Sequence, residues 1–361
     1  MSEANPSLQN FDFENHKARA VLDYQKIRDV YEGCSETVKS ILKQTFSEKR
    51  IKVATIEARA KAIDSFAEKA VTPNEEDPSS PKYADPLTEI TDLSGVRVIT
   101  FFPNTITEVE EVIREQFEVI ERINKTDILI KNEKLGYQSV HFLVQLKHNR
   151  GILPEYSRFS YLKTEIQVRT ILQHAWAEIE HDIQYKSEET IPAQIKRRFI
   201  ALAGLIEIAD REFQAIQNED DRIRIEARQS VSEGKLGQVE ITGDALKAYL
   251  DRKLGSDGRM TDTSYDWEAK RLIKYGFRNF QELEECLSPY DDNEVSRKVS
   301  GGRQGQLTRF EYMLLAALGE KFITNHEWKS AEWWSKWKYE LLGKIKAAGI
   351  PTGTCAIEPT K

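Results

Sequence analysis

Residues 164–170 read TEIQVRT, and this stretch decides the fold class of the N-terminal part of the chain. Apolar Ile166 and Val168 alternate with polar residues, which is the period-two pattern of a strand with one buried face and one polar face. The polar residues are Glu165, Gln167 and Arg169. The same alternation recurs in residues 140–146, VHFLVQL, so a second half-buried strand is expected there.

The segments around these strands predict a sheet covered by helices. Strands outnumber the helices that could connect them, which favours a mixed or largely antiparallel sheet flanked by helices, an α/β (α+β) fold. Residues 73–86 contain four prolines and are expected to form a loop. Further strands are expected at 96–102 and 118–123, and helices at 17–46, 56–71, 106–117, 171–185 and 192–220.

A charge-dense stretch at residues 219–228 is typical of a solvated helix end or linker. It divides the chain into an expected N-terminal domain, 1–225, and a small, mostly α-helical domain, 226–361. The periodicity in the second domain predicts helices at 243–254, 266–286, 310–322 and 328–348, and a loop at 289–306. In the last helix we expect one face to form the core, with the lysines outside: Trp333, Trp337, Leu341 and Ile345. Alternatively, its interleaved aromatic residues and lysines bind RNA or a partner.

Composition narrows the class of protein. The chain has 361 residues, 40% of them hydrophobic, a net charge of −7, and only three cysteines. This excludes a disulfide framework, and the lack of an apolar run near 20 residues predicts no membrane span, so a cytoplasmic protein is expected. Basic and acidic residues balance in 232–361, so the negative charge lies in the N-terminal part. Any anion site must therefore come from a local cluster.

A cationic cluster lies in the expected helix 56–71. On a helix, Lys61, Ser65 and Lys69 would follow one another at successive turns of one face, with Arg59 nearby. Two ammonium groups and a hydroxyl in one stripe could hold a phosphate, although a solvated cationic face has the same pattern.

Two acidic residues are candidates for a magnesium site. Asp92 comes just before the expected strand that contains Arg97, and Gly95 between them permits a close backbone approach. Paired across the sheet, Asp92 and Glu165 would supply the carboxylates that a magnesium–triphosphate complex needs. The alternative for Asp92 is a turn in which its side chain bonds its own backbone.

An aromatic residue and two polar residues, Tyr137, Ser139 and His141, share one face of the expected strand that follows Gly136. A ring beside hydrogen-bonding groups suits a stacked base with contacts to phosphate or ribose. Packing of the ring beneath a loop is the alternative.

These clusters, in this order, resemble the synthetase domain of the RelA/SpoT alarmone synthetases over residues 20–220. The most diagnostic part runs from Glu165 to Lys186. The resemblance implies a nucleotidyltransferase-like mixed sheet flanked by helices. It also implies a Mg²⁺-dependent transfer of pyrophosphate from ATP to the 3′-hydroxyl of GDP or GTP, which makes the alarmone (p)ppGpp.

The resemblance also implies residue roles. Arg59 and Arg97 would sandwich adenine, and Asp92 would hold Mg²⁺ with Glu165 as a second carboxylate that helps to activate the acceptor. The triphosphate would be held by Lys61, Ser65 and Lys69. The acceptor would contact Tyr137, stacked on guanine, and also Lys134, His141, Gln167 and His174. Lys134 stands beside Glu133, which occupies the position where the family usually has a lysine.

Other readings stay open. No hydrolase domain is expected before residue 20, so the resemblance favours a monofunctional synthetase. One alternative is that this chain is similar to toxic family members. It would then transfer pyrophosphate to the 3′ end of tRNA and be inhibited by its C-terminal domain. A nucleotide sensor without catalysis is a further alternative. A regulatory protein or ligand at the C-terminal domain and a homo-oligomer are the other expected partners.

Overall fold

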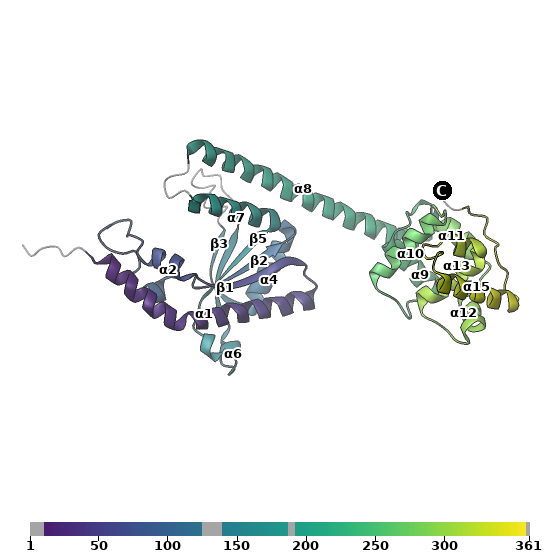
Figure 1. Cartoon of the computed structure of the whole chain (residues 1–361), viewed down its shortest axis with the longest axis horizontal. Helices are drawn as coiled ribbons and strands as arrows, with labels where there is room; N and C mark the ends of the chain where they lie inside the picture. Colours follow the sequence, from purple (N-terminus) through teal and green to yellow (C-terminus); the bar gives the residue numbers. More distant parts are fainter. Residues whose placement is uncertain (1–10, 125–138, 187–191, 359–361) are drawn as a thin grey trace, which may run out of the picture. The chain divides into compact units, whose positions relative to one another are not determined.

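The computed structural model describes residues 11–124, 139–186 and 192–358 (Figure 1). The chain divides into two compact units, Met1–Ile216 and Gln217–Lys361. Within the described residues, no helix has both the length and the apolar character needed to cross a bilayer.

The first unit contains a five-stranded mixed sheet, as expected, with the strand order β1-β2-β5-β4-β3. β2 and β5 are parallel, whereas the other three pairs of neighbours are antiparallel. The strands are β1 (Val53–Ala60), β2 (Ser94–Thr100), β3 (Phe117–Asn124), β4 (Val140–Leu146) and β5 (Thr164–Thr170). The stretch TEIQVRT is thus a strand, and it pairs on both sides with other strands.

One face of the sheet carries the apolar side chains and packs against two helices, α1 (Phe13–Lys49) and α4 (Pro103–Gln116). Each of the central strands contributes buried residues to this core: Val96 and Val98 from β2, Phe142, Val144 and Leu146 from β4, and Ile166 and Val168 from β5. α1 begins at Asp12, whose carboxylate accepts a hydrogen bond from the backbone N–H of Asn15. Three short turns complete the layer: α3 (Pro86–Glu89), α6 (His148–Gly151) and η1 (Ser157–Phe159).

The other side of the sheet is covered in part by α7 (Ile171–Lys186), which follows β5 directly (Figure 1). A long helix, α8 (Ala193–Ser232), is joined to the end of β5 by the buried Asp210, which accepts a 2.7 Å hydrogen bond from the hydroxyl of Thr170. The side chain of Gln173 accepts a hydrogen bond from the N–H of Thr170 and closes this network at the start of α7.

The prediction of a single helix over 56–71 is wrong. The segment forms β1 and then a short helix, α2 (Ile63–Ala70), with Lys61 between them. Ile56 and Ala58 alternate with Glu57 and Arg59, and this period-two pattern places the segment at the edge of the sheet beside β2. The spacing of cationic residues imitates a helical stripe, but pairing with β2 determines the local structure.

The second unit is helical, as expected. Its core joins α9, α10, α11 and α13 around buried aromatic residues that include Tyr249, Tyr265 and Phe280. Its elements are η2 (Leu236–Gln238), α9 (Gly243–Leu254), α10 (Asp262–Lys274), α11 (Phe280–Leu287), α12 (Asp292–Ser300), α13 (Gln306–Leu318), α14 (Glu320–Thr324) and α15 (Glu332–Ala347).

Several boundaries differ from the sequence-based expectation, and two of these differences have a clear local cause. The expected helix 266–286 is divided at Gly276, where φ is 99° and a Cβ would lie 2.1 Å from the carbonyl oxygen of Glu358. The expected loop 289–306 contains α12, which begins at Asp291 as N-cap and ends at Gly301 in the left-handed conformation. The N-cap Asp291 and the C-cap Gly301 of α12 could both have been recognised in the sequence.

The expected core face of α15 is wrong in part. Leu341 and Ile345 are buried, but the indole at the start of the apolar face is Trp334. Trp333 and Trp337 are 67% and 45% exposed. The buried side of the helix instead takes in Lys338, whose ammonium donates a 2.7 Å hydrogen bond to Glu311. The helix is thus turned by about one residue relative to the expectation.

We predict that Asp210→Ala lowers the free energy of unfolding of the first unit by about 1–3 kcal/mol, because it removes a buried hydrogen bond and leaves Thr170 without its acceptor. Chemical denaturation of the whole chain, followed by far-UV circular dichroism, measures the change. Glu207→Ala, on an exposed part of α8, is the matched control and should stay within about 0.5 kcal/mol. Equal effects would contradict the anchoring role of Asp210.

Candidate active site

The second face of the sheet is polar, and the strand register gathers the candidate residues on it. Arg59 lies opposite Gly95, and Gly95 lies opposite Glu165. Residues directly opposite in neighbouring strands point to the same side of a sheet. In the next row, Arg97, Gln167 and His141 are opposite one another. The face therefore presents these residues together: Arg59, Arg97, Glu165, Gln167 and His141.

A carboxylate held between two lysines lies at one end of this face. The ammonium of Lys61 donates a 2.8 Å hydrogen bond to Asp92 Oδ2, and that of Lys69 lies 3.1 Å from Asp92 Oδ1. The side chains of Lys61 and Asp92 are only 15% and 24% exposed. The two lysines come from different elements, since Lys61 precedes α2 and Lys69 belongs to its last turn.

The position of Lys61 is fixed through its backbone. Its N–H donates to the carbonyl of Leu93, the residue after Asp92, at 3.0 Å. Its carbonyl accepts a 2.8 Å hydrogen bond from the hydroxyl of Tyr24 and one from Arg28. Tyr24 is fully buried and stacks on Phe66 of α2 with ring centroids 4.4 Å apart. The core between α1 and α2 thus sets the geometry of the lysine and the aspartate.

The charge state of Asp92 follows from these contacts. Burial by itself raises the pKa of the Asp92 carboxyl, but the hydrogen bond and charge of Lys61, with those of Lys69, outweigh it and hold the pKa below its ordinary value of 3.8. Asp92 is therefore ionised at neutral pH, and the cluster of two cations and one anion carries a net positive charge.

Arg59 connects this cluster with the centre of the sheet. Burial lowers the pKa of the Arg59 guanidinium, and the charge of Arg97 adds to the effect. Three carboxylates oppose the shift, so all of them lie within electrostatic reach of Arg59: Glu178, Asp92 and Glu165. Asp92, in the loop before β2, and Glu165 of β5 are thus both close enough to Arg59 to act on its charge.

A chain of hydrogen bonds runs along the middle of the polar face. Glu165 Oε1 lies 2.8 Å from His141 Nδ1, and its Oε2 accepts a 2.9 Å hydrogen bond from the amide of Gln167. His141 Nε2 in turn lies 2.8 Å from the hydroxyl of Ser139. An ionised Glu165 accepts only, so His141 carries its proton on Nδ1 toward the carboxylate. Arg169 donates to Gln167 at 3.0 Å and extends the chain.

Glu178 of α7 closes the site above the sheet. Its carboxylate forms a 3.1 Å ion pair with Arg97, and His174 lies one turn earlier with Nδ1 at 3.7 Å. Burial, reinforced by the charge of Arg169, lowers the pKa of His174, so this imidazole is neutral at physiological pH. On the opposite side Glu57 of β1 lies 3.8 Å from Arg97.

The structure thus brings together most residues that the sequence singled out. Lys61 and Lys69 meet at Asp92, although they do not follow one another on one helix as predicted. Ser65 is exposed on α2, one turn before Lys69. Lys134 and Tyr137 lie outside the described residues. Glu178 was present in the sequence as part of the stretch after β5 but had no predicted role. Glu178 and Arg97 are far apart in the sequence, so their ion pair could not be predicted from it.

The residues suit a hard cation only in part. Both oxygens of Asp92 already face ammonium groups, Oδ2 that of Lys61 at 2.8 Å and Oδ1 that of Lys69 at 3.1 Å, so a metal ion would have to displace or share these cations. Both oxygens of Glu165 already face hydrogen-bonding groups. The described residues contain no group of three or more histidine, cysteine or acidic side chains that could hold a metal ion. Mg²⁺ would therefore need oxygen ligands from a bound polyphosphate in addition to Asp92 and Glu165.

A small hollow opens beside Glu165 at the other end of the face. His141 and Leu143 of β4, Glu121 of β3 and Thr91 also line it. The hollow is next to Glu165, whose carboxylate lies 2.8 Å from His141 Nδ1. It therefore offers room for a hydroxyl group beside a base.

Comparison with known proteins gives consistent results. The description "Region found in RelA / SpoT proteins" matches residues 58–190. GTP pyrophosphokinase YwaC of Bacillus subtilis (strain 168) is 31% identical over 132 residues, which cover 37% of this chain and 60% of that protein. GTP pyrophosphokinase YjbM of the same strain is 28% identical over 169 residues, covering 45% of this chain and 72% of that protein.

A likeness in shape is also found. The crystal structure of the small alarmone synthetase 1 from Bacillus subtilis gives a TM-score of 0.45 at 25% sequence identity, and the superposition covers 55% of this chain and 98% of that one.

We predict that Asp92→Asn lowers the free energy of unfolding at pH 7 by about 1–2 kcal/mol, because Lys61 and Lys69 lose their counter-charge. The pKa of Asp92 is lowered on folding, so its contribution is present above the ordinary value of 3.8 and is lost as the pH falls through the folded value. The difference between the variant and the parent should therefore fade below about pH 4. Urea denaturation at several pH values measures it.

Asp64→Asn, which removes an exposed carboxylate on α2, is the control, and its effect should be small at every pH. A difference for Asp92→Asn that stays constant down to pH 3 would show that the carboxylate charge contributes nothing.

Proposed function

Residues 58–190 belong to the RelA/SpoT family, and on that premise we propose that this protein transfers pyrophosphate from ATP to the 3′-hydroxyl of GDP or GTP and so makes (p)ppGpp. The observation that carries the proposal is the ionised Asp92, held between Lys61 and Lys69 on the face that also presents Glu165. Such an arrangement suits a reaction in which a polyphosphate and a metal ion are positioned beside a hydroxyl nucleophile.

The donor would bind at the cationic end of the face. The β- and γ-phosphates of ATP would replace Asp92 as the partners of Lys61 and Lys69, since phosphate oxygens offer the same charge-assisted hydrogen bonds. Asp92 would then be free to hold Mg²⁺, which supplies charge neutralisation at the transferred group when it is bound. Arg59 and Arg97, adjacent on the sheet, would stack on adenine, and Glu178 would fix the plane of Arg97.

The acceptor would bind at the other end, beside the hollow. Glu165 would accept the proton of the 3′-hydroxyl, and the hydrogen bond from His141 would hold the carboxylate in place. Gln167 and the neutral His174 would orient the acceptor. Tyr137 and Lys134 keep the roles that the family resemblance implies, stacking on guanine and contacting a phosphate. Since the nucleophile is a hydroxyl, positioning and charge neutralisation would provide most of the rate.

Incubation of the whole chain with γ-³²P-labelled ATP, Mg²⁺ and one acceptor tests the proposal directly. GDP, GTP and deacylated tRNA are supplied in separate reactions, and the products are resolved by chromatography or gel. We expect label in guanine nucleotides. Label in tRNA alone would support the alternative acceptor and refute the proposed one, and label in neither would favour a sensor without catalysis.

We predict that Glu165→Gln lowers kcat for pyrophosphate transfer at least about 100-fold, because an amide cannot accept the hydroxyl proton. Binding of ATP, measured by isothermal titration with a non-hydrolysable analogue, should change little. Glu121→Gln, in the lining of the same hollow, is the matched control and should retain most of the activity. Equal losses of kcat in the two variants would contradict the role of Glu165 as base.

A further inference from the structure

The solvent-facing side of α15 is unusually rich in exposed aromatic side chains. Trp333 is 67% exposed, and Trp337, one turn later, is 45% exposed. Tyr339 is 45% exposed on the same helix, and Trp328, in the segment before it, is 47% exposed. Large aromatic side chains are normally covered, so the exposed Trp328, Trp333 and Trp337 mark a site of interaction, whereas Tyr339, two residues after Trp337, points to the other flank of the helix.

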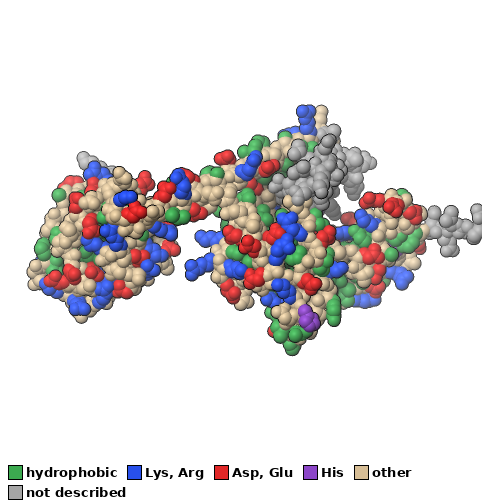
Figure 2. Space-filling model, turned by 180° about the vertical axis from the view of Figure 1, so that it is seen from behind, with side chains coloured by type: hydrophobic (Ala, Val, Ile, Leu, Met, Phe, Trp, Pro, Cys, Tyr) green, Lys and Arg blue, Asp and Glu red, His purple; other side chains and the backbone are tan. Residues whose placement is uncertain are grey.

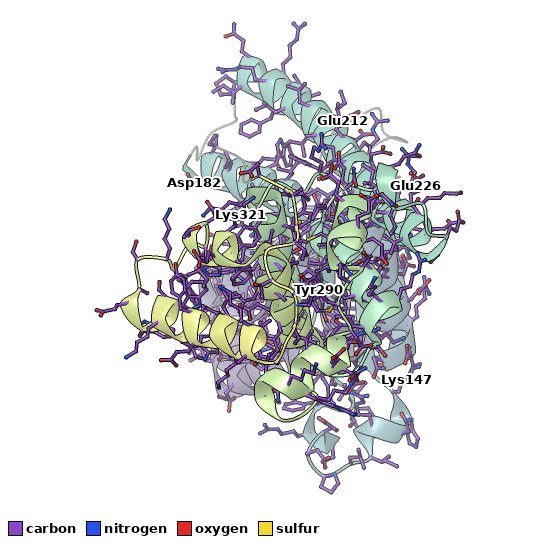
Figure 3. The ribbon with its side chains drawn as sticks, turned by 90° about the vertical axis from the view of Figure 1, so that its right-hand side faces the viewer. Lys147, Asp182, Glu212, Glu226, Tyr290 and Lys321 are labelled. Atoms are coloured by element: carbon purple, nitrogen blue, oxygen red, sulfur yellow. The ribbon has the colours of Figure 1, made fainter. Side chains whose placement is uncertain are left out.

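These rings do not belong to the core. The core position of the helix is filled by Trp334, which is 2% exposed and stacks on His326 with ring centroids 4.0 Å apart. The buried side chains of Leu341 and Ile345 continue that inner face. Trp333 precedes Trp334 by one residue and therefore points about 100° away from it around the helix axis. Figure 3 shows α15, in yellow, on the outside of its unit with side chains extending away from it.

The exposed rings are held on a rigid support. The N–H of Trp328 donates a 3.0 Å hydrogen bond to His326 Nδ1, and its carbonyl accepts one from Ala331 at 2.9 Å. The hydroxyl of Ser335 on α15 donates to the carbonyl of Lys329 at 2.7 Å. The rings of Trp328 and Trp333 lie 6.4 Å apart. An ordered platform of this kind loses little conformational entropy when it binds a partner.

Lysines without a counter-ion surround the platform. Four of them are exposed on α15 or just before it, and within the described residues none forms an ion pair: Lys329, Lys336, Lys344 and Lys346. Two exposed acidic residues of α15, Glu332 and Glu340, lie among these lysines. The surface is thus positive locally, although basic and acidic residues balance over 232–361. Figure 2 shows basic and acidic side chains interspersed over the visible face of the molecule.

The platform continues onto α10. Arg271 of α10 forms a 3.1 Å ion pair with Glu327, the residue before Trp328. Beside this ion pair, a hollow is lined by Trp267, which is 51% exposed, and by the two lysines of the same helix, Lys270 and Lys274. A fourth exposed tryptophan, Trp267, and two further cations therefore lie next to the residues around Trp328.

We propose that this surface, formed by the exposed aromatic residues and lysines of α15, the segment 326–331 and α10, binds single-stranded nucleic acid. Unstacked bases offer flat faces to the indole rings, and the phosphates between them pair with lysines that form no ion pair in the part of the chain that the structure describes. A duplex hides its base faces and cannot use the rings. The proposal does not depend on pyrophosphate transfer at the sheet, and either can fail without the other.

Fluorescence anisotropy with the whole chain and a fluorescein-labelled, single-stranded RNA of 20 nucleotides tests this proposal. We expect saturable binding that is at least about tenfold tighter than for a duplex of the same sequence and that weakens with salt. The double variant Trp333→Ala/Trp337→Ala should weaken binding at least about tenfold. Lys336→Ala/Lys344→Ala should weaken it and also reduce the salt dependence.

Met260→Ala, which removes an exposed apolar side chain of the same unit outside this surface, is the matched control and should bind like the parent. Circular dichroism checks that each variant is folded, which is expected because the replaced rings are exposed. Equal affinity for single strands and duplex would overturn the proposal, as would full binding by the tryptophan variant. Absence of RNA binding, with self-association that the tryptophan variant abolishes, would overturn it in favour of a contact between copies of this chain.

Discussion

The contact of Asp92 with Lys61 and Lys69 is the interaction on which the rest of the first unit depends. It joins the loop before β2 to the segment between β1 and α2, and it does so where the side chains are largely screened from water. Partly buried charges of like sign repel strongly unless an anion separates them. The carboxylate therefore allows two lysines to lie close together. A polyphosphate could take over the same role, because it supplies the same charge to the same donors.

Backbone hydrogen bonds to Lys61 explain how the geometry of this cluster can be fixed without a large pocket. Tyr24 and Arg28 of α1 hold the carbonyl of Lys61, and the N–H of Lys61 is bonded to Leu93. The same helix packs through Val38 and Leu42 against the apolar face of the sheet. One helix thus stabilises the sheet and orients the site on its opposite face. Any movement of the Lys61 backbone would have to disturb a fully buried tyrosine, so the position of this residue is set before a substrate binds.

The sequence predicted the strands well where both faces of a strand differ in polarity. TEIQVRT and VHFLVQL are strands, and their polar residues share one face with Arg97. The sequence-based prediction was wrong where both a helical and a strand periodicity fit the same residues. Lys61, Ser65 and Lys69 match a helical stripe, and only the pairing of β1 with β2 decides for a strand in the residues just before them. On α15, neighbouring tryptophans fit the core equally well by sequence. The rings of Phe322 and His326 select Trp334, which periodicity could not reveal.

The two units handle charge in opposite ways. At the polar face of the sheet, Lys61, Lys69 and Arg97 each form an ion pair with a carboxylate, and carboxylates also act on the charge of Arg59. These charges are partly buried. Such pairs favour a defined geometry and are weakly affected by salt. On α15 the lysines are exposed and unmatched within the described residues, while a buried lysine, Lys338, is paired with Glu311. Exposed cations without an ion-pair partner, beside flat rings, favour ligands that carry negative charge and can stack, and they do not require one exact ligand shape. A site of the first kind suits catalysis on a small substrate, and a surface of the second kind suits a flexible polyanion.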